Sequence, residues 1–365
     1  MKIIAFYLPQ FHEIPENNQW WGKGFTEWTN TRKATPLFKN HYQPHTPLNN
    51  NYYNLLDDGV LEKQIDIAKK YGVDAFCFYH YWFKGGKKLL EKPLEYVLAN
   101  KSLDFPFCIC WANESWSRRW DGSNKEILIE QDYDDDENWK NHFYYLKQFF
   151  EDERYIKIDG HPVMLIYKPQ EIPELSKKLS VWNFLAKQHG FGRIIFISQY
   201  PQVNKEIERL FDYNIEFEPE YTATEIRNHK FRFLFKNPLA LFSMLYSKLF
   251  LTLKIRHYKK LSYKRFSNIS SKRIIAANHL PGLFTSWDNT PRRKNGGIVY
   301  HGSSPMLFKR YASIQISKAK SNNCPFVFVN AWNEWAEGAH LEPDDKYGYD
   351  YLEALFEAKK GNKTL

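Results

Sequence analysis

The chain has 365 residues, of which 43% are hydrophobic and 25% charged, with 51 Lys and Arg against 42 Asp and Glu. This balance is typical of a globular protein and excludes a disordered or collagen-like chain. The four cysteines show no Cys-x-x-Cys spacing, so we expect buried, reduced thiols and no disulfide framework.

Eight short apolar runs recur along the chain, and segments of helical period separate most of them. The predicted strands are 3–8, 75–81, 107–112, 163–167, 194–199, 214–217, 282–286 and 326–331. The predicted helices include 61–71, 139–150, 182–186, 308–316 and 351–355. This alternation predicts an α/β protein with a parallel sheet. Eight units over residues 1–365 predict a single-domain (β/α)8 TIM barrel, with an open doubly wound sheet as the alternative.

The beginning of the chain reads as a strand, without a charged segment followed by a long apolar run. No stretch reaches about 18 uncharged apolar residues. We therefore expect no signal peptide, no membrane-spanning helix and a cytoplasmic protein.

Tryptophan is concentrated at the ends of the predicted strands, where 10 of the 12 tryptophans lie. In a barrel these ends meet on the face that carries active sites. The flat apolar face and the N–H of tryptophan suit the C–H faces and hydroxyls of a sugar ring, although such residues also cover barrel mouths. The collection favours a ligand cleft.

The segment 226–273 differs from the rest in charge. It contains 13 Lys and Arg and no Asp or Glu, which exceeds the net charge of +9 for the whole chain. Apolar residues from 239 to 253 follow a helical stripe, and a basic run covers 254–260. A basic amphipathic insertion predicts peripheral contact of 233–260 with an anionic membrane, at the inner face of the plasma membrane. The alternative is a solvated arm that packs on the barrel; no nucleic-acid partner is expected.

The strongest chemical signal is Asn333-Glu334-Trp335-Ala336-Glu337-Gly338, directly after the last predicted strand. Two carboxylates three residues apart point into one cleft if the chain turns helically there. Glycosyl chemistry uses such a pair, one as acid/base at the bridging oxygen and the other as base or nucleophile. We therefore predict Glu334 and Glu337 as catalytic residues; the alternative is an acidic helix start stabilised by the helix dipole.

A second element of this kind, Trp111-Ala112-Asn113-Glu114-Ser115-Trp116, follows the third predicted strand. Glu114 is either a substrate contact or a salt-bridge partner of Arg118 and Arg119. The predicted substrate-binding residues are Gln10, His12, Glu27, Trp28, Tyr79, His80, Trp82, Trp111, Asn113, Glu114, Trp116, Trp287, Asp288, Asn333 and His340. Among them, Asn113, Asn333 and His340 are expected to hold sugar hydroxyls.

The run Asp134-Asp135-Asp136 resembles an acidic metal motif but directly precedes a predicted helix. A solvated helix start is the favoured interpretation. We expect no metal and no cofactor, and the absence of a Gly-x-Ser-x-Gly elbow argues against a serine hydrolase.

Together these motifs resemble the WbsX family of glycosyltransferases, relatives of the family 99 glycoside hydrolases (endo-α-mannosidases and mannanases). The matching pieces are 5–12, 24–28, 111–114, 286–290, 330–338 and 341–343. The resemblance implies a (β/α)8 barrel and work on bacterial surface polysaccharide, such as O-antigen or capsule. Through the Asn-Glu-Trp-x-Glu-Gly element it implies that Glu337 is the acid/base at the bridging oxygen. Glu334 would be the base on the sugar 2-hydroxyl, giving a 1,2-anhydro sugar and net retention, although Ala336 stands where those hydrolases carry His.

Three functions remain open at this point. The first is a glycosyltransferase that builds or trims a lipid-linked glycan, and the second is a retaining, endo-acting glycoside hydrolase of the endo-α-mannosidase type. The third is a non-catalytic glycan-binding barrel.

Overall fold

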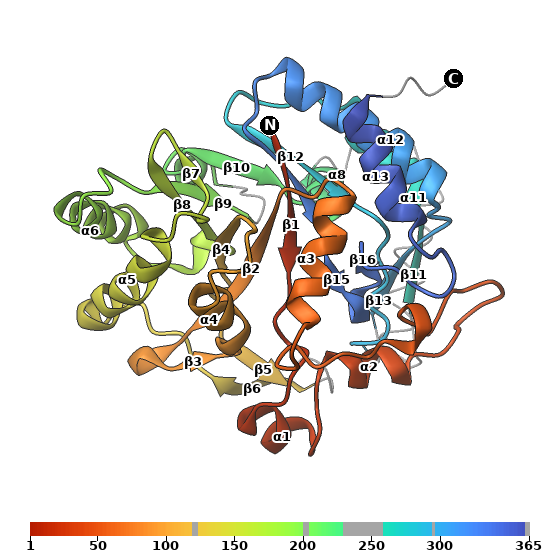
Figure 1. Ribbon diagram of the computed structural model, residues 1–365, viewed down its shortest axis with the longest axis horizontal. Helices are drawn as coiled ribbons and strands as arrows, with labels where there is room; N and C mark the ends of the chain where they lie inside the picture. Colours follow the sequence, from red (N-terminus) through yellow and green to blue (C-terminus); the bar gives the residue numbers. More distant parts are fainter. Residues whose placement is uncertain (119–122, 200–203, 229–257, 294–295, 362–365) are drawn as a thin grey trace.

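The computed structural model describes residues 1–118, 123–199, 204–228, 258–293 and 296–361 (Figure 1). Eight parallel strands form the centre: β1 (Lys2–Tyr7), β2 (Ala75–Trp82), β4 (Phe107–Trp111), β8 (His161–Ile166), β9 (Ile195–Ser198), β10 (Tyr213–Glu216), β12 (His279–Phe284) and β14 (Phe326–Asn330). Each pairs with the next in this series, and β14 pairs with β1. The predicted barrel is therefore confirmed, and the open sheet is wrong.

Helices cover the barrel and its two ends. They are α1 (Pro15–Trp21), α2 (Glu27–Lys33), α3 (Val60–Lys70), α4 (Lys92–Ala99), α5 (Asp136–Phe150), α6 (Leu175–Gln188), α7 (Lys205–Glu208), α8 (Glu220–Asn228), α11 (Tyr263–Lys272), α12 (Pro305–Ser321) and α13 (Asp350–Lys360). The short 3-10 helices are η1 (Leu48–Asn50), η2 (Lys84–Gly86), η3 (Pro169–Glu171) and η4 (Trp335–Glu337). The five predicted helices correspond to α3, α5, α6, α12 and α13.

The remaining strands are short additions to this frame. β3 (Lys88–Leu89) and β7 (Lys157–Ile158) pair with β2 and β8. Three separate pairs are β5 (Trp116–Arg118) with β6 (Ser123–Ile129), β11 (Tyr258–Ser262) with β13 (Gly297–His301), and β15 (Asn333–Glu334) with β16 (Ala339–His340).

The barrel strands read as continuous apolar runs because both of their faces are buried. In β1, the Phe6 ring points into the barrel, 5.3 Å from Phe217 and 5.4 Å from Phe328 between ring centroids. The next side chain, Tyr7, points outward and its hydroxyl donates to Gln64 of α3 at 2.5 Å. Neighbouring residues of a strand thus face the barrel interior and the helical layer in turn.

Local sequence explains where α5 begins. The Asp135 carboxylate accepts from the backbone N–H groups of Glu137 and Asn138 and caps the helix. The acidic run is therefore a helix start, as predicted. All four cysteines are free and buried, also as predicted.

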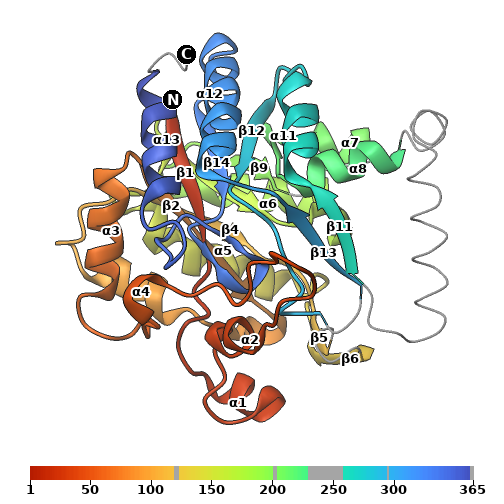
Figure 2. The same ribbon diagram turned by 90° about the vertical axis from the view of Figure 1, so that its right-hand side faces the viewer.

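The carboxyl ends of the barrel strands lie on one side of the molecule. In Figures 1 and 2, β1 runs downward from the amino terminus, and α1, α2 and the β5–β6 pair lie beyond the lower ends of the strands. This is the face on which barrel enzymes build their sites.

The described part of the basic segment 226–273 comprises the end of α8, β11 and α11. α11 lies on the outside of the barrel, where Ser270 hydrogen-bonds Tyr311 of α12 at 3.0 Å. The apolar stripe 239–253 and the start of the basic run lie outside the described residues, so the membrane contact stays a prediction. Among the residues that the structure describes, no helix combines the length and apolar character that crossing a bilayer requires.

Candidate active site

A cavity of about 420 Å³ lies at the carboxyl ends of the barrel strands. Most of the eight strands or the loops that follow them contribute to its wall. The lining includes Leu8, Gln10, Tyr79, Tyr81, Glu114, Trp116, Tyr167, Phe217, Trp287, Asn289, Arg292, Asn330, Glu334 and Glu337. The cavity therefore combines aromatic surfaces with carboxylates, a guanidinium and amides.

The two predicted catalytic residues sit on a tight hairpin after β14. Glu334 ends β15, the 3-10 helix η4 carries Glu337, and Gly338 turns the chain back into β16 with a φ of 58°. Asp288 N–H donates to the Glu337 carbonyl at 2.6 Å, which fixes the hairpin against the segment after β12. One helical turn places both carboxylates on the same side, as the spacing predicts.

Arg292 joins three carboxylates at the wall of this cavity. Its Nε lies 2.8 Å from Glu27 Oε1, its Nη2 2.7 Å from Glu334 Oε2 and its Nη1 2.8 Å from Glu337 Oε1. Only a guanidinium can donate to three partners in one plane. Glu27, Glu334 and Glu337 can therefore lie close together although their charges repel.

The surroundings change the proton affinity of these groups. Burial raises the pKa of Glu334 to about 8; Arg292 opposes the rise, and Glu337 and Glu27 add to it. Burial also raises the pKa of Glu27, against the attraction of Arg292. Because the Glu337 side chain is 21% exposed and that of Glu334 only 8%, the two carboxylates sit in unlike environments. Unlike environments are what divide acid and base roles between two carboxyl groups.

Two asparagines position the glutamates that follow them. Asn333 accepts from Leu8 N–H at 2.7 Å and donates to the Leu8 carbonyl at 3.0 Å. Asn113 does the same with Lys168, at 2.7 Å from its N–H and 2.8 Å from its carbonyl. In both places the amide ties one strand end to the next strand of the barrel. These amides are therefore engaged with backbone, whereas the sequence predicts that they hold sugar hydroxyls.

Seven predicted site residues line the cavity: Gln10, Tyr79, Glu114, Trp116, Trp287, Glu334 and Glu337. Gln10 Nε2 is buried and has no hydrogen-bond partner among the described residues, so it can donate to a ligand. Glu114 forms an ion pair with Lys168, while Arg119 and the side chain of Arg118 lie outside the described residues, so their predicted pairing with Glu114 stays a prediction.

Three aromatic candidates at strand ends point away from the cavity. His80 Nε2 lies 2.9 Å from His142 Nε2, and Trp82 stacks on His142 with ring centroids 4.7 Å apart. Trp111 is 1% exposed and packs between β4 and the helices, 5.6 Å from Trp139. The physical reason is the alternation of a strand: in β2, Tyr79 and Tyr81 line the cavity, and the residues next to them face the helices.

Five further candidates lie outside the cavity lining. Trp28 packs against Trp335 and donates to the Tyr53 carbonyl at 2.8 Å. Glu27 contacts the site through its ion pair with Arg292 and through its backbone N–H, which donates to the Gln10 carbonyl at 3.0 Å, and Asp288 accepts from Gln43 at 2.6 Å. His12 is 1% exposed, and His340 belongs to a separate cluster described below.

Sequence reasoning missed Tyr81 and Arg292. The alternation in β2 predicts Tyr81 once Tyr79 is placed inside. Arg292 carries no such signal, because it lies in an irregular segment and its partners are 42, 45 and 265 residues away in the chain.

Hydrogen bonds to the carboxylate of Glu342 also stabilise the hairpin. This carboxylate accepts from the indole N–H groups of Trp335 at 2.7 Å and Trp332 at 3.1 Å, and from Gln64 and Tyr53 at 2.6 and 2.8 Å. Such a fully satisfied buried network holds its members in one arrangement. Glu342 therefore fixes the backbone that carries Glu334 and Glu337.

The barrel and its carboxylate-lined cavity define a (β/α)8 barrel enzyme, with its cavity on the face where this class works. The chain belongs to the family described as glycosyltransferase WbsX, whose family model matches residues 3–355. The resemblance drawn from the sequence is therefore confirmed. Membership of this family indicates a carbohydrate-active enzyme.

Two curated relatives are proteins named WxcX, described as uncharacterized, from two strains of Xanthomonas campestris pv. campestris. The chain is 35% identical to them over 364 and 363 residues. Each alignment covers 98% of this chain and 49% of the relative, so the chain spans about half the length of the curated relatives it matches.

Two solved structures share the fold. The GH99 endo-alpha-mannosidase from Bacteroides thetaiotaomicron is similar with a TM-score of 0.54 and 12% identity, covering 98% of this chain and 95% of that chain. A glycoside hydrolase-like protein gives a TM-score of 0.54 and 13% identity, covering 98% and 93%. At such low identity the similarity shows the common fold alone.

Proposed function

We propose that this chain is a glycosyltransferase that acts in the biosynthesis of bacterial surface polysaccharide, such as O-antigen or capsule, on a lipid-linked glycan. The observation that carries the proposal is the pair of carboxylates, Glu334 and Glu337, held on one guanidinium in the cavity. Family membership supports sugar transfer as the reaction class.

In the proposed mechanism Glu337, the more exposed carboxyl, gives its proton to the oxygen that leaves the donor sugar. Glu334 removes the proton of the 2-hydroxyl, whose oxygen attacks the anomeric carbon and forms a 1,2-anhydro sugar. Glu337 then takes the proton of the acceptor hydroxyl, which opens this ring at the anomeric carbon, and Glu334 returns its proton to the 2-oxygen. In the free protein burial raises the pKa of Glu334 to about 8 and keeps the proton there, so this mechanism requires that proton to pass to Glu337 when the donor sugar binds.

The cavity walls supply the binding surface in this proposal. Trp116 and Trp287 offer faces on which a sugar ring can stack, and Gln10 offers an unpaired amide N–H. Arg292 keeps the carboxylates in place and balances their charge as protons move.

A hydrolase is the second candidate, because the same two carboxylates activate water as readily as a sugar hydroxyl. The alternative is then a retaining, endo-acting glycoside hydrolase. The two reactions differ only in the acceptor, so the product distinguishes them.

The test uses the purified protein, its Glu337→Gln variant and the control Glu357→Gln, whose side chain is 46% exposed on α13. Lipid-linked glycan extracted from the host is incubated with and without a pool of nucleotide sugars, and products are weighed by mass spectrometry. A gain of one sugar that requires the pool and Glu337, and that persists in Glu357→Gln, is the expected result.

A loss of mass without the pool, again dependent on Glu337, establishes the hydrolase and overturns the first proposal. Turnover in Glu337→Gln within threefold of the wild type removes the mechanism. Glycan binding that is unchanged by Glu337→Gln, without any product, indicates a non-catalytic glycan-binding barrel.

We also propose that the basic segment holds the protein at an anionic membrane surface, close to a lipid-linked substrate. Four basic residues of the segment, Lys236, Lys248, Lys254 and Arg256, are replaced together by Gln. This choice leaves β11 intact, which a deletion of 233–260 would cut.

The matched control replaces four exposed lysines elsewhere, Lys140, Lys157, Lys177 and Lys187, and changes the net charge equally. Sedimentation with phosphatidylglycerol vesicles should fall for the first variant only, and wild-type binding should weaken as salt rises. Equal sedimentation of the two variants contradicts membrane contact through this segment.

A further inference from the structure

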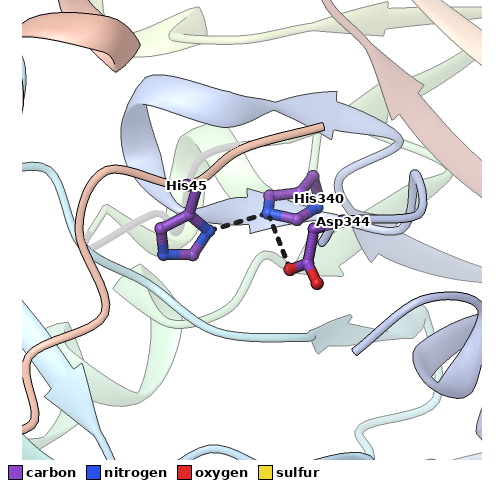
Figure 3. Close-up of side chains that lie close together, drawn as sticks. All are labelled: His45, His340 and Asp344. Atoms are coloured by element: carbon purple, nitrogen blue, oxygen red, sulfur yellow. Dashed lines mark hydrogen bonds and ion pairs between the residues drawn. The ribbon is translucent and has the colours of Figure 1, made fainter. Parts of the chain in front are cut away.

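Three buried side chains from two distant parts of the chain converge behind the catalytic hairpin. His45 precedes η1, His340 belongs to β16, and Asp344 follows it (Figure 3). Their nearest ligand atoms all lie within 4.8 Å of one another. None of the three lines the cavity described above, so the cluster is a separate feature.

The protonation of His340 follows from its partners. Its Nδ1 lies 2.9 Å from the Glu342 carbonyl oxygen, and a carbonyl can only accept. Nδ1 therefore carries the proton, and Nε2 of the neutral ring accepts from His45 Nδ1–H at 2.8 Å, a proton that a bound cation would replace. A histidine whose second nitrogen donates to a backbone carbonyl is the usual form of a metal ligand.

Asp344 is oriented in the same direction. Its Oδ1 accepts from the backbone N–H groups of Lys346 at 3.0 Å and Tyr347 at 2.6 Å. These bonds turn Oδ2 toward His340 Nε2, at 3.8 Å. At that distance no hydrogen bond joins the two atoms, and a cation held between them would draw on the lone pairs of both.

Two of the three separations between the ligand atoms suit a small cation. Ligand atoms at the 2.0–2.1 Å bond lengths of tetrahedral zinc lie roughly 3.4 Å apart. Two observed distances lie on either side of this value. His45 Nδ1 is 2.8 Å from His340 Nε2, and His340 Nε2 is 3.8 Å from Asp344 Oδ2. Stacking keeps both rings in place: Tyr42 lies 4.2 Å from His45, and Trp335 lies 3.8 Å from His340, between centroids.

We propose that His45, His340 and Asp344 bind one divalent transition-metal ion, with zinc the ion that two imidazoles and a carboxylate suit best. The site leaves a fourth position for water. Its role is structural: it joins the segment before η1 to the hairpin that carries Glu334 and Glu337. The sequence gives no sign of this ligand set, because His45 and His340 are 295 residues apart.

The test is the zinc content of tag-free full-length protein, stripped with a chelator and titrated with Zn²⁺. Asp344→Asn is the informative variant, since the Asn oxygen can still accept from Lys346 and Tyr347 and only the ligand oxygen is lost. Asp345→Asn is its control, because it changes the same charge on the neighbouring residue, which caps Asn49 N–H at 3.1 Å instead.

The wild type and Asp345→Asn should bind one zinc ion per chain, and Asp344→Asn should bind at least about tenfold more weakly. Saturating zinc should raise the wild-type Tm by about 3 °C and leave that of Asp344→Asn unchanged. His45→Gln serves as a second variant in case Asp344→Asn does not fold. A wild type without stoichiometric zinc, or a variant that binds as tightly as the wild type, overturns the proposal and leaves a hydrogen-bonded cluster.

Discussion

At the scale of single residues, Arg292 determines the electrostatics of the cavity. It is 13% exposed in its side chain and bonds three carboxylates, of which Glu27 is completely buried. The carboxylates keep the pKa of Arg292 well above its ordinary value although burial opposes this, so the guanidinium stays charged. One guanidinium cannot balance the negative charge of three ionised carboxylates, so a proton shared among them lowers the cost of the remaining charge. Because the pKa of Glu334 is raised to about 8, the proton resides longest on Glu334.

The raised pKa of Glu334 predicts a dependence of stability on pH. Between the ordinary carboxyl pKa near 4.5 and about 8, the unfolded chain has lost this proton and the folded chain keeps it. The folded state therefore loses stability as pH rises through this window, by at most a few kcal/mol. Glu334→Gln imitates the protonated form and removes the loss. Its Tm relative to the wild type should be several degrees higher at pH 8 than at pH 5, measured by circular dichroism.

The exposed Glu357→Gln provides the control for this measurement, and its Tm difference should be the same at both pH values. If the difference in Tm between Glu334→Gln and the wild type does not grow with pH, this contradicts the proton-sharing arrangement around Arg292.

At the scale of elements, the two Asn-Glu motifs share one local construction. Beyond each strand end, the side-chain amide of the asparagine makes the two hydrogen bonds that the next pair of backbone groups would otherwise make. Asn113 joins β4 to β8 in this way, and Asn333 joins β14 to β1. The glutamate that follows faces the cavity in both cases. The repetition noted in the sequence therefore reflects how a strand end is fixed so that the next side chain faces the ligand.

Asn333→Ala should destabilise the protein, because it leaves the buried N–H and carbonyl of Leu8 without their partner. The expected loss is roughly 2–4 kcal/mol, equivalent to roughly 3–5 °C in Tm. Calorimetry of this variant beside Asn141→Ala, an exposed position on α5, measures it. If the two variants melt within one degree of each other, the Asn333 bonds do not stabilise the hairpin.

At the scale of the whole molecule, barrel closure assembles the cavity. Residues near or after the carboxyl ends of β1, β2, β4, β8, β10, β12 and β14 share one wall, although they are spread over more than 300 residues of chain. Closure requires each strand to approach its neighbours closely. Among the glycines that the structure describes, the tightest approach lies between β10 and β12, where a Cβ on Gly282 would stand 2.1 Å from the Glu216 carbonyl oxygen.

Gly282→Ala should therefore open the barrel or prevent folding, since the Glu216 carbonyl that the new methyl would meet belongs to the backbone and cannot move aside. The yield of soluble protein and its Tm provide the measurement. Gly160→Ala is the control: its φ of +81° adds backbone strain, but nothing lies within 4 Å of the new methyl. A Gly282→Ala protein as stable as the Gly160→Ala protein shows that β10 and β12 can separate without cost.

By itself the sequence determined the order and number of the barrel strands and the positions of Glu334 and Glu337. These depend on local patterns, namely buried runs, helical period and a three-residue spacing. Tertiary structure alone decided which strand-end residues face the cavity, why Trp111 and His80 face the helices, and which cation holds the carboxylates. It also brought His45 to His340. Such contacts join residues far apart in the chain, and only closure of the barrel makes them neighbours.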